Sequence, residues 1–322
     1  MLIIISCMLA AMCGSSCDTP TDIESGDGEI SHFKDDSGYF WGEEPIDSVW
    51  EGHWALFDES PTWSVKGWIA YEHTKGINSD DPGVGGIYLI REDGRDKHLI
   101  YEDPFAARPE WSPDGEWLVF SSLGTVVKIP LSGEYVDTLL PAGEWNHTCW
   151  SPDGKYIACG WPYGTKAGIW IMTADGDSVH RIIEHGGDPY WPYPDSIIYI
   201  NGDLKYPPCS ICISHISGEF GRVIYTPDTF FVPGTVNPEM HRQTQKIVFG
   251  PCLVSSTAAE TWIINADGSN LKRLTYLSGY TPAFSPDGQR IVYGDGRRGE
   301  MSGLWIMNTD GTKKHQLTSN PW

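Results

Sequence analysis

Short apolar runs recur along the chain in a fixed order, and each run is bounded by turn residues. Six segments share a large apolar or aromatic residue, a four-residue turn related to Ser-Pro-Asp-Gly, and a short β-rich stretch. They are PTWSVKGWIAYEH (61–73), PEWSPDGEWLVFSS (109–122), TCWSPDGKYIACG (148–160), PYWPYPDSIIYING (189–202), PEMHRQTQKIVFG (238–250) and PAFSPDGQRIVYGD (282–295). In this turn Pro presets φ, Asp bonds its own backbone and Gly takes a positive φ, so each segment predicts a hairpin of two strands.

A second hairpin is predicted after each of these segments. It has an apolar limb such as IWIM or LWIM, an Asp-Gly or Ser-Gly turn, and a more polar outer limb. The six copies cover residues 86–100, 124–140, 168–183, 209–225, 261–276 and 303–318. Their turn glycines are spaced by 39, 43, 42, 50 and 43 residues, which is typical of blades in a β-propeller.

Two hairpins per repeat predict an all-β fold, a six-bladed β-propeller with four antiparallel strands per blade, over residues 45–322. One blade cannot bury both of its faces, so the Trp and Phe residues before the first turn are expected to pack between blades. The sixth copy finishes its outer strand just before Trp322, so the ring is expected to close without a donated C-terminal strand. Residues 45–57 are expected to add an edge strand that shields a blade.

The repeat unit resembles that of the TolB-like propeller family, with its WD40-like (PD40) repeats. The pattern is WSPDG-x-x-[I/L]-[V/A]-[F/Y], followed by [I/L]-W-[I/V]-M-x-x-D-G and, after five intervening residues, Leu-Thr; it spans residues 61–322 and is strongest in copies 2, 3 and 6. The resemblance implies a bacterial envelope protein that binds other envelope proteins at the mouth of the ring and does not catalyse a reaction. Only about 40 residues separate Cys17 from Pro61, too few for the α/β domain that precedes the TolB propeller, which implies a role other than that of TolB.

The N-terminal segment reads as an export signal. Residues 1–16 form an apolar run that ends in small residues and is shorter than a bilayer-spanning helix. Cys17 follows at a position that resembles a bacterial lipoprotein cleavage site, so lipidation of Cys17 is expected, with a plain secretory signal as the alternative. Residues 17–44 are polar and acidic, which predicts a flexible tether. We therefore expect a periplasmic protein that reaches the membrane only through a lipid anchor.

Charge excludes one class of partner. The chain has 43 acidic and 22 basic residues, and residues 18–60 alone hold 13 acidic side chains and one basic. An acidic chain without a basic cluster does not bind the phosphate backbone, so no nucleic-acid partner is expected. Apolar residues at 40% are enough for a substantial buried core.

Five cysteines lie in the propeller region. Cys149 and Cys159 flank the turn of the third copy at mirrored positions, so they either form a disulfide or remain two buried thiols. Cys209 and Cys212 form a lone CxxC, which lacks the second pair of a zinc site and the histidine of a haem attachment. A bridge from either to Cys252 stays open.

Catalytic motifs are missing from the sequence. The ten histidines are scattered without an HExxH spacing, and no GxSxG occurs. We expect no cofactor, no metal and no catalytic residues. Asp-Gly pairs are read as turn residues rather than calcium ligands. His147, His241 and Arg108 supply only part of the cluster that a metal-dependent polysaccharide lyase would need.

One column of the repeat is polar in every copy and carries the candidate binding site. It lies where the first strand of each repeat begins, and five of its six members precede Pro. The six residues are Ser60, Arg108, His147, Asp188, Asn237 and Thr281. In a propeller this position lies near the channel mouth, where loops from all blades converge.

These observations predict a non-enzymatic, exported and lipid-anchored propeller that binds an envelope protein or peptide as a monomer. The alternatives are a propeller that binds a small ligand or an oligosaccharide and, with less support, a metal-dependent polysaccharide lyase.

Overall fold

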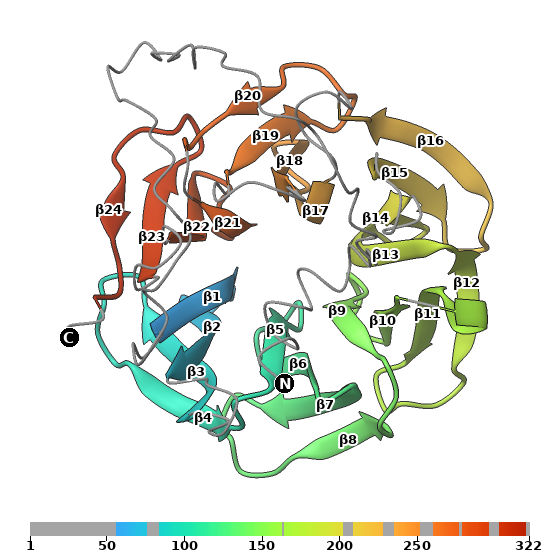
Figure 1. The fold of residues 1–322 in the computed structure, drawn as a ribbon, viewed down its shortest axis with the longest axis horizontal. Coiled ribbons are helices and arrows are strands. Elements are labelled where there is room, and N and C mark those ends of the chain that lie inside the picture. Colours follow the sequence, from blue (N-terminus) through green and yellow to red (C-terminus); the bar gives the residue numbers. More distant parts are fainter. Residues whose placement is uncertain are drawn as a thin grey trace, which may run out of the picture.

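Six antiparallel sheets stand around a central axis, and each contains four strands that follow one another in the sequence (Figure 1). The computed structural model describes residues 56–75, 84–162, 164–201, 209–227, 235–251, 260–276, 279–295 and 303–319. The predicted six-bladed β-propeller with four-stranded blades is confirmed. The predicted signal (1–16), Cys17, the tether (17–44) and most of the proposed edge strand lie outside the described residues; residues 56 and 57 open the first strand.

The blades use the chain in order, from the innermost strand to the outermost. Blade 1 has β1 (Leu56–Trp63), β2 (Trp68–Lys75), β3 (Val84–Arg91) and β4 (His98–Glu102). Blade 2 has β5 (Ala106–Trp111), β6 (Trp117–Ser122), β7 (Thr125–Pro130) and β8 (Asp137–Leu140). Blade 3 has β9 (Asn146–Trp150), β10 (Tyr156–Trp161), β11 (Gly168–Thr173) and β12 (His180–Glu184), with a 3₁₀ turn, η2 (Gly164–Lys166), before β11.

Blades 4 to 6 follow the same plan. Blade 4 has β13 (Gly186–Tyr193), β14 (Ser196–Asn201), β15 (Ser210–His215) and β16 (Phe220–Tyr225). Blade 5 has β17 (Thr235–His241), β18 (Lys246–Pro251), β19 (Trp262–Asn265) and β20 (Lys272–Arg273). Blade 6 has β21 (Tyr280–Phe284), β22 (Arg290–Asp295), β23 (Gly303–Asn308) and β24 (His315–Gln316).

The Ser-Pro-Asp-Gly segments form the tight turns that the sequence predicts. In blade 2 the Gly115 amide donates to the Ser112 carbonyl over 2.9 Å, and Gly115 has a φ of 70°. The Asp114 carboxylate accepts from the Ser112 hydroxyl (2.6 Å) and from the Glu116 amide (3.0 Å). Because these bonds are local, the hairpin is specified by its own four turn residues.

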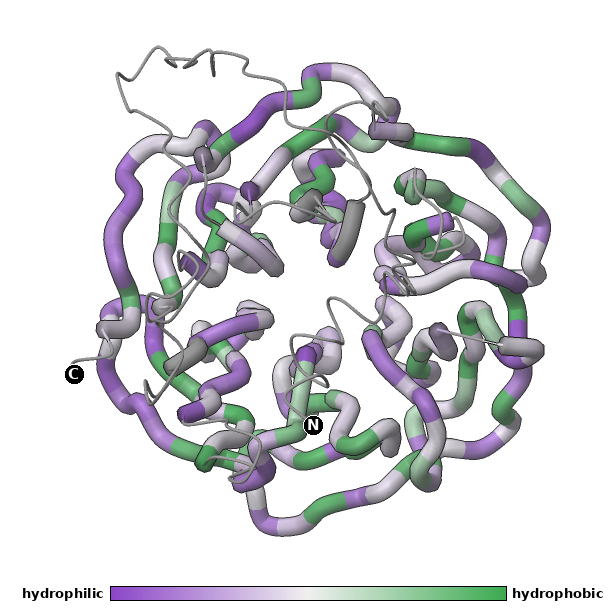
Figure 2. Tube along the Cα trace, in the orientation of Figure 1, coloured by the Kyte–Doolittle hydropathy of each residue, from purple (hydrophilic) through white to green (hydrophobic). Residues whose placement is uncertain are grey.

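Each pair of neighbouring blades shares one apolar cluster, and each cluster contains the large residue that precedes the first turn of the following blade. These six residues, all at least nine-tenths buried, are Trp63, Trp111, Trp150, Trp191, Met240 and Phe284. The predicted role of the aromatic residues as wedges between blades is therefore confirmed. Figure 2 shows the same division along the chain, with hydrophobic runs in the middle strands and more hydrophilic outermost strands.

Within the described residues, the ring closes through side chains, without exchange of a strand. Blade 1 and blade 6 are separate sheets, as the sequence predicted. Asp58 of β1 is fully buried between them; its Oδ1 lies 2.6 Å from His73 Nδ1, and its Oδ2 accepts from the Thr318 hydroxyl (2.5 Å). Thr318 in turn accepts from the Leu304 amide over 2.8 Å, which ties the end of blade 6 to the start of blade 1.

Among the described residues, none of the helices is long and apolar enough to cross a membrane.

Candidate binding site at the channel mouth

The first strand of every blade carries a β-bulge at the polar column identified in the sequence. In five blades the column residue and the Pro after it lie opposite a single residue of the second strand. In blade 3 His147 is the extra residue, between the pairs Asn146–Gly160 and Thr148–Cys159. Since a bulge redirects a side chain out of the regular alternation of a strand, the bulges give these residues a direction that their neighbours lack.

All six column residues have a left-handed backbone. Their φ angles lie between 44° and 56°, a region that non-glycine residues rarely adopt. We call these residues the rim: Ser60, Arg108, His147, Asp188, Asn237 and Thr281. The residue before a proline favours extended backbone, so five rim residues hold a conformation against their local preference. The ring of packed blades imposes it.

The rim residues surround one small cavity at the centre of the ring. All six line it, together with the five rim prolines, Thr148 and three residues of the next layer, Glu110, Tyr190 and Glu239. The cavity measures about 60 Å³, enough for a few water-sized groups. The six column residues thus converge at the channel mouth, as the sequence predicts. Ligand binding there remains a proposal.

Arg108 crosses the mouth. Its Nη1 donates to the Asn237 side-chain oxygen and lies 2.7 Å from His147 Nδ1. Arg108 belongs to blade 2 and Asn237 to blade 5, on opposite sides of the ring (Figure 1). The Arg108 amide donates to Glu72 Oε1 over 2.6 Å, which fixes the backbone from which this arm extends.

His147 and Asp188 form a buried pair beside Arg108. Asp188 Oδ1 lies 2.9 Å from His147 Nδ1, and Asp188 Oδ2 accepts from the backbone amide of Asn237 over 3.1 Å. Burial and the Arg108 charge lower the pKa of His147 despite the neighbouring carboxylate, so the ring is neutral. Burial alone would raise the pKa of Asp188, but the contacts with His147 and Arg108 hold it below its usual value.

The mouth has more hydrogen-bonding groups than its own contacts satisfy. An arginine only donates and an ionised aspartate only accepts, so a neutral His147 Nδ1 pairs with one of its two neighbours at a time. His147 Nε2 and Thr148 Oγ1, both buried, have no hydrogen-bond partner in the described chain. Unpaired buried polar atoms are costly, and a bound polar group would complete them.

Acidic side chains surround the rim, and sequence reasoning missed them. Burial raises the pKa of Glu59 and of Glu110 to about 7 each. Burial also raises the pKa of Glu72, and burial together with Glu110 raises that of Glu239 well above its usual value. The repeated Pro-Glu after the rim, at 109–110 and 238–239, was the available signal for two of these four residues.

The thiols of blade 3 do not form a disulfide, so this alternative is wrong. Cys149 and Cys159 are both free and buried. The strand register pairs Cys149 with Ala158, one residue short of Cys159. Successive side chains of a strand point to opposite faces, and accordingly Cys149 packs against blade 4 while Cys159 packs against blade 2.

The two cysteines of the CxxC segment are both buried. Cys212 is a free thiol, and Cys252 lies outside the described residues. Within the ranges that the structure describes, no group of three or more His, Cys, Asp or Glu residues is placed to hold a metal ion.

Comparisons with known proteins identify the same architecture. No family model matches the chain. An uncharacterized protein of Agrobacterium fabrum, Atu1656, is 27% identical over 130 residues, which are 38% of this chain and 44% of that protein. The chain thus matches less than half the length of this relative.

Solved structures extend the likeness to most of the described ring. The structure assigned to TolB from Agrobacterium tumefaciens has a TM-score of 0.57 and 19% identity, over 70% of this chain and 84% of that one. TolB from Acinetobacter baumannii gives 0.60 and 21%, over 71% of this chain and 58% of that one. An oligogalacturonate lyase in complex with manganese gives 0.54 and 11%, over 82% and 78%. The predicted resemblance to TolB-like propellers is confirmed at the level of the fold.

Proposed function

We propose that this chain is a TolB-like propeller that binds a protein or peptide partner of the bacterial cell envelope at its channel mouth, without catalysing a reaction. The observation that supports the proposal is the rim: six bulged, left-handed residues from six blades enclose one polar cavity. Every blade has a strained backbone at this position, and the six side chains placed there are all of different kinds. Strain repeated in this way is typical of a recognition site.

The rim suits a small polar group at the end of a partner segment. Arg108 supplies a positive charge, Asp188 a negative one, and His147 and Thr148 supply unpaired polar atoms. The cavity is too small for a folded element, so a side-chain tip or a chain terminus enters it while the rest of the partner lies on the loops around it.

The proposal includes export and anchoring. The apolar run over residues 1–16 directs the chain to the periplasm, and a lipid on Cys17 holds it at the membrane through the acidic tether (17–44). The propeller acts as a monomer. It meets no nucleic acid, because its net charge is −21.

The test is affinity capture from detergent-solubilised membranes, read by mass spectrometry, with rim variants as bait. Arg108→Ala and Asp188→Asn are compared with Lys155→Ala, whose side chain is three-quarters exposed in the turn at the other end of blade 3. We expect one envelope protein to be retained by wild type and by Lys155→Ala, and its recovery to fall at least tenfold with either rim variant. Equal recovery by all four baits would remove the rim from the interface.

Anchoring and the ligand class are tested on the same material. Cys17→Ala should move the chain from the membrane to the soluble fraction; an unchanged distribution would refute the lipid anchor. A rise in melting temperature with small sugars or oligogalacturonates that is lost in Arg108→Ala would favour the small-ligand alternative. Unsaturated sugar products that form only with added Mn²⁺ would favour the lyase.

A further inference from the structure

Blade 2 holds a buried lysine where the other five blades hold an aliphatic residue. Lys128 pairs with Val119 in the two middle strands, and its residue exposure is only 6%. The residues at the same register position in the other blades are Leu89, Ile171, Ile213, Ile263 and Ile306. Burial of an ammonium group is costly, so the packing of blades alone does not account for a lysine at this position.

The Lys128 ammonium group reaches blade 3 but is only partly satisfied there. Nζ donates to the Ala174 carbonyl over 2.8 Å and lies 4.9 Å from the centre of the Trp117 ring. Two carboxylates stand farther away, Asp175 at 3.6 Å and Asp137 at 3.8 Å. An ammonium has three N–H donors, and one of them has an acceptor at short distance.

A cavity of about 280 Å³ lies beside this lysine, between blades 2 and 3. Lys128, Trp117 and Trp150 line it, together with the turn residues Asp114, Asp153 and Asp175. These turns lie at the opposite ends of the inner strands from the rim. Trp150 is 8% exposed, and its Nε1 has no acceptor in the described chain. The indole N–H groups of Trp111 and Trp191 also lack an acceptor in the described chain. The feature that distinguishes this cavity is therefore Lys128, because the other blades have an aliphatic residue at its position.

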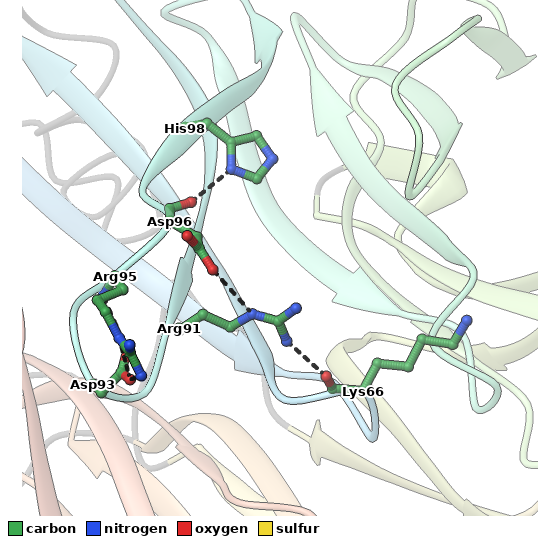
Figure 3. Close-up of polar contacts among 6 residues, drawn as sticks. All are labelled: Lys66, Arg91, Asp93, Arg95, Asp96 and His98. Atoms are coloured by element: carbon green, nitrogen blue, oxygen red, sulfur yellow. Dashed lines mark hydrogen bonds and ion pairs between the residues drawn. The ribbon is translucent and has the colours of Figure 1, made fainter.

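The matching place in blade 1 is occupied by the protein itself. Trp68 and Arg91 pair there as Trp117 and Pro130 pair in blade 2. The Arg91 guanidinium lies 3.5 Å from the centre of the Trp68 ring and donates to the Lys66 carbonyl over 2.9 Å (Figure 3). Blade 2 has a proline in place of that arm, which leaves the space beside its indole open.

The lining restricts what the cavity can take. The carboxylates of Asp114, Asp153 and Asp175 repel an anion, and the hydroxyl of Ser151 lowers the pKa of Asp153, which keeps it ionised. A cation would meet the Lys128 ammonium. A neutral group with both hydroxyl donors and oxygen acceptors, and with an apolar C–H face for the indole walls, satisfies the carboxylates and the ammonium together.

We propose that this inter-blade cavity, referred to as the Lys128 cavity, is a binding site for one neutral sugar ring, separate from the channel mouth. Lys128 donates to ring or hydroxyl oxygens, the aspartates accept from hydroxyls, and Trp117 packs against the C–H face. The site is independent of the proposed function of the rim.

The test is saturation-transfer NMR of the full chain with an equimolar mixture of D-glucose, D-galactose, D-mannose and N-acetyl-D-glucosamine. D-glucuronate and D-glucosamine are the charged counterparts. Lys128→Ile restores the residue type of the other blades, and Lys128→Met keeps the length of the side chain without its charge. Lys314→Ile is the matched control, because Lys314 makes the same kind of bond, to the Leu274 carbonyl of blade 5.

We expect transfer to at least one neutral sugar, with a dissociation constant at least tenfold lower than for either charged sugar. Both Lys128 variants should weaken binding at least tenfold, whereas Lys314→Ile should leave it within twofold. Absence of transfer to all four neutral sugars in the wild type overturns the proposal, as does preference for a charged sugar. Unchanged affinity in either Lys128 variant, once that variant is shown to be folded, also overturns the proposal.

Discussion

At the scale of single residues, the mouth contains carboxyl groups that have lost water without gaining a cation. Glu110 accepts from the Thr62 hydroxyl over 3.1 Å, and Glu239 Oε1 accepts from the Phe284 amide over 2.9 Å. Burial is the main reason that the pKa of each is raised, and each carboxylate makes ionisation of the other harder. The pKa of Glu110 is therefore about 7, and that of Glu239 also lies well above its usual value.

Glu110→Gln should change how stability depends on pH. The pKa of Glu110 is about 7 in the folded state and near 4.5 in the unfolded state, so the folded state binds more protons between these values. Wild-type stability should therefore fall as pH rises through this window, by at most about 3 kcal/mol from this group. We expect Glu110→Gln to match wild type at pH 5 and to exceed it at pH 8.

Thermal unfolding at pH 5, 6, 7 and 8 measures this difference, with Glu134→Gln as the control because Glu134 is exposed. The neutral His147 and the ionised aspartates contribute equally to all three proteins, so only the difference between variants is interpreted. A constant difference between wild type and Glu110→Gln across this range would contradict a raised pKa at Glu110.

At the scale of the strand, the bulge explains why the rim side chains converge. An uninterrupted first strand would alternate its side chains between the two faces of the blade. With the extra residue, Arg108 and Asn237 instead leave the alternation and meet across the mouth. The cost is a left-handed φ, which Asn tolerates better than a β-branched residue.

Substitutions of Asn237 separate the contribution of its side-chain contact from that of its left-handed backbone, because Gly and Val both remove the side-chain amide. Its φ of 51° suits Gly and is strained for Val. We expect Asn237→Val to be less stable than Asn237→Gly by about 1–2 kcal/mol, measured by urea unfolding. Both variants should lose the Arg108 contact and weaken partner capture to the same extent. Equal stability of the two variants would mean that the bulge is not held in the left-handed region.

Much of the architecture is legible in the sequence because it depends on local chemistry. The Ser-Pro-Asp-Gly turns satisfy their own hydrogen bonds, and the residue before each turn is large enough to fill the gap to the preceding blade. The rim column could be aligned for the same reason. Its backbone could not be foreseen, since a residue before Pro favours extended φ and only the ring enforces the bulge.

Contacts between blades are harder to predict from the sequence than the structure of a single blade. Glu72 lies on a second strand, in a stretch that reads as an ordinary edge of a hairpin, and its bond to the Arg108 amide exists only because two blades meet at the mouth. The disulfide alternative failed on register: mirrored spacing around a turn suggests facing thiols, but pairing of Cys149 with Ala158 turns Cys159 to the other face.

At the scale of the whole molecule, the ring is closed by packing and by one buried polar connection. Asp58 joins β1, β2 and the segment after β24, through His73 and Thr318. A second bond crosses the same junction at the rim, where the Ser60 amide donates to the Thr281 hydroxyl oxygen over 3.0 Å. No described strand is shared between blades 1 and 6, so their separation breaks these polar contacts, the Arg290–Glu92 ion pair and one apolar cluster.

Asp58→Ala should therefore weaken the whole domain and not merely one blade. It leaves the His73 ring and the Thr318 hydroxyl without their acceptor in a buried place, a loss of about 2–4 kcal/mol. Asp93→Ala is the control, because the Asp93–Arg95 pair is exposed and its loss should leave the free energy of unfolding nearly unchanged. Urea unfolding followed by tryptophan fluorescence gives the free energies.

Hydrogen exchange should show faster opening of β1 and β21–β23 in Asp58→Ala before the other blades open. Uniform exchange around the ring would mean that the junction of blades 1 and 6 is no weaker than the other five junctions.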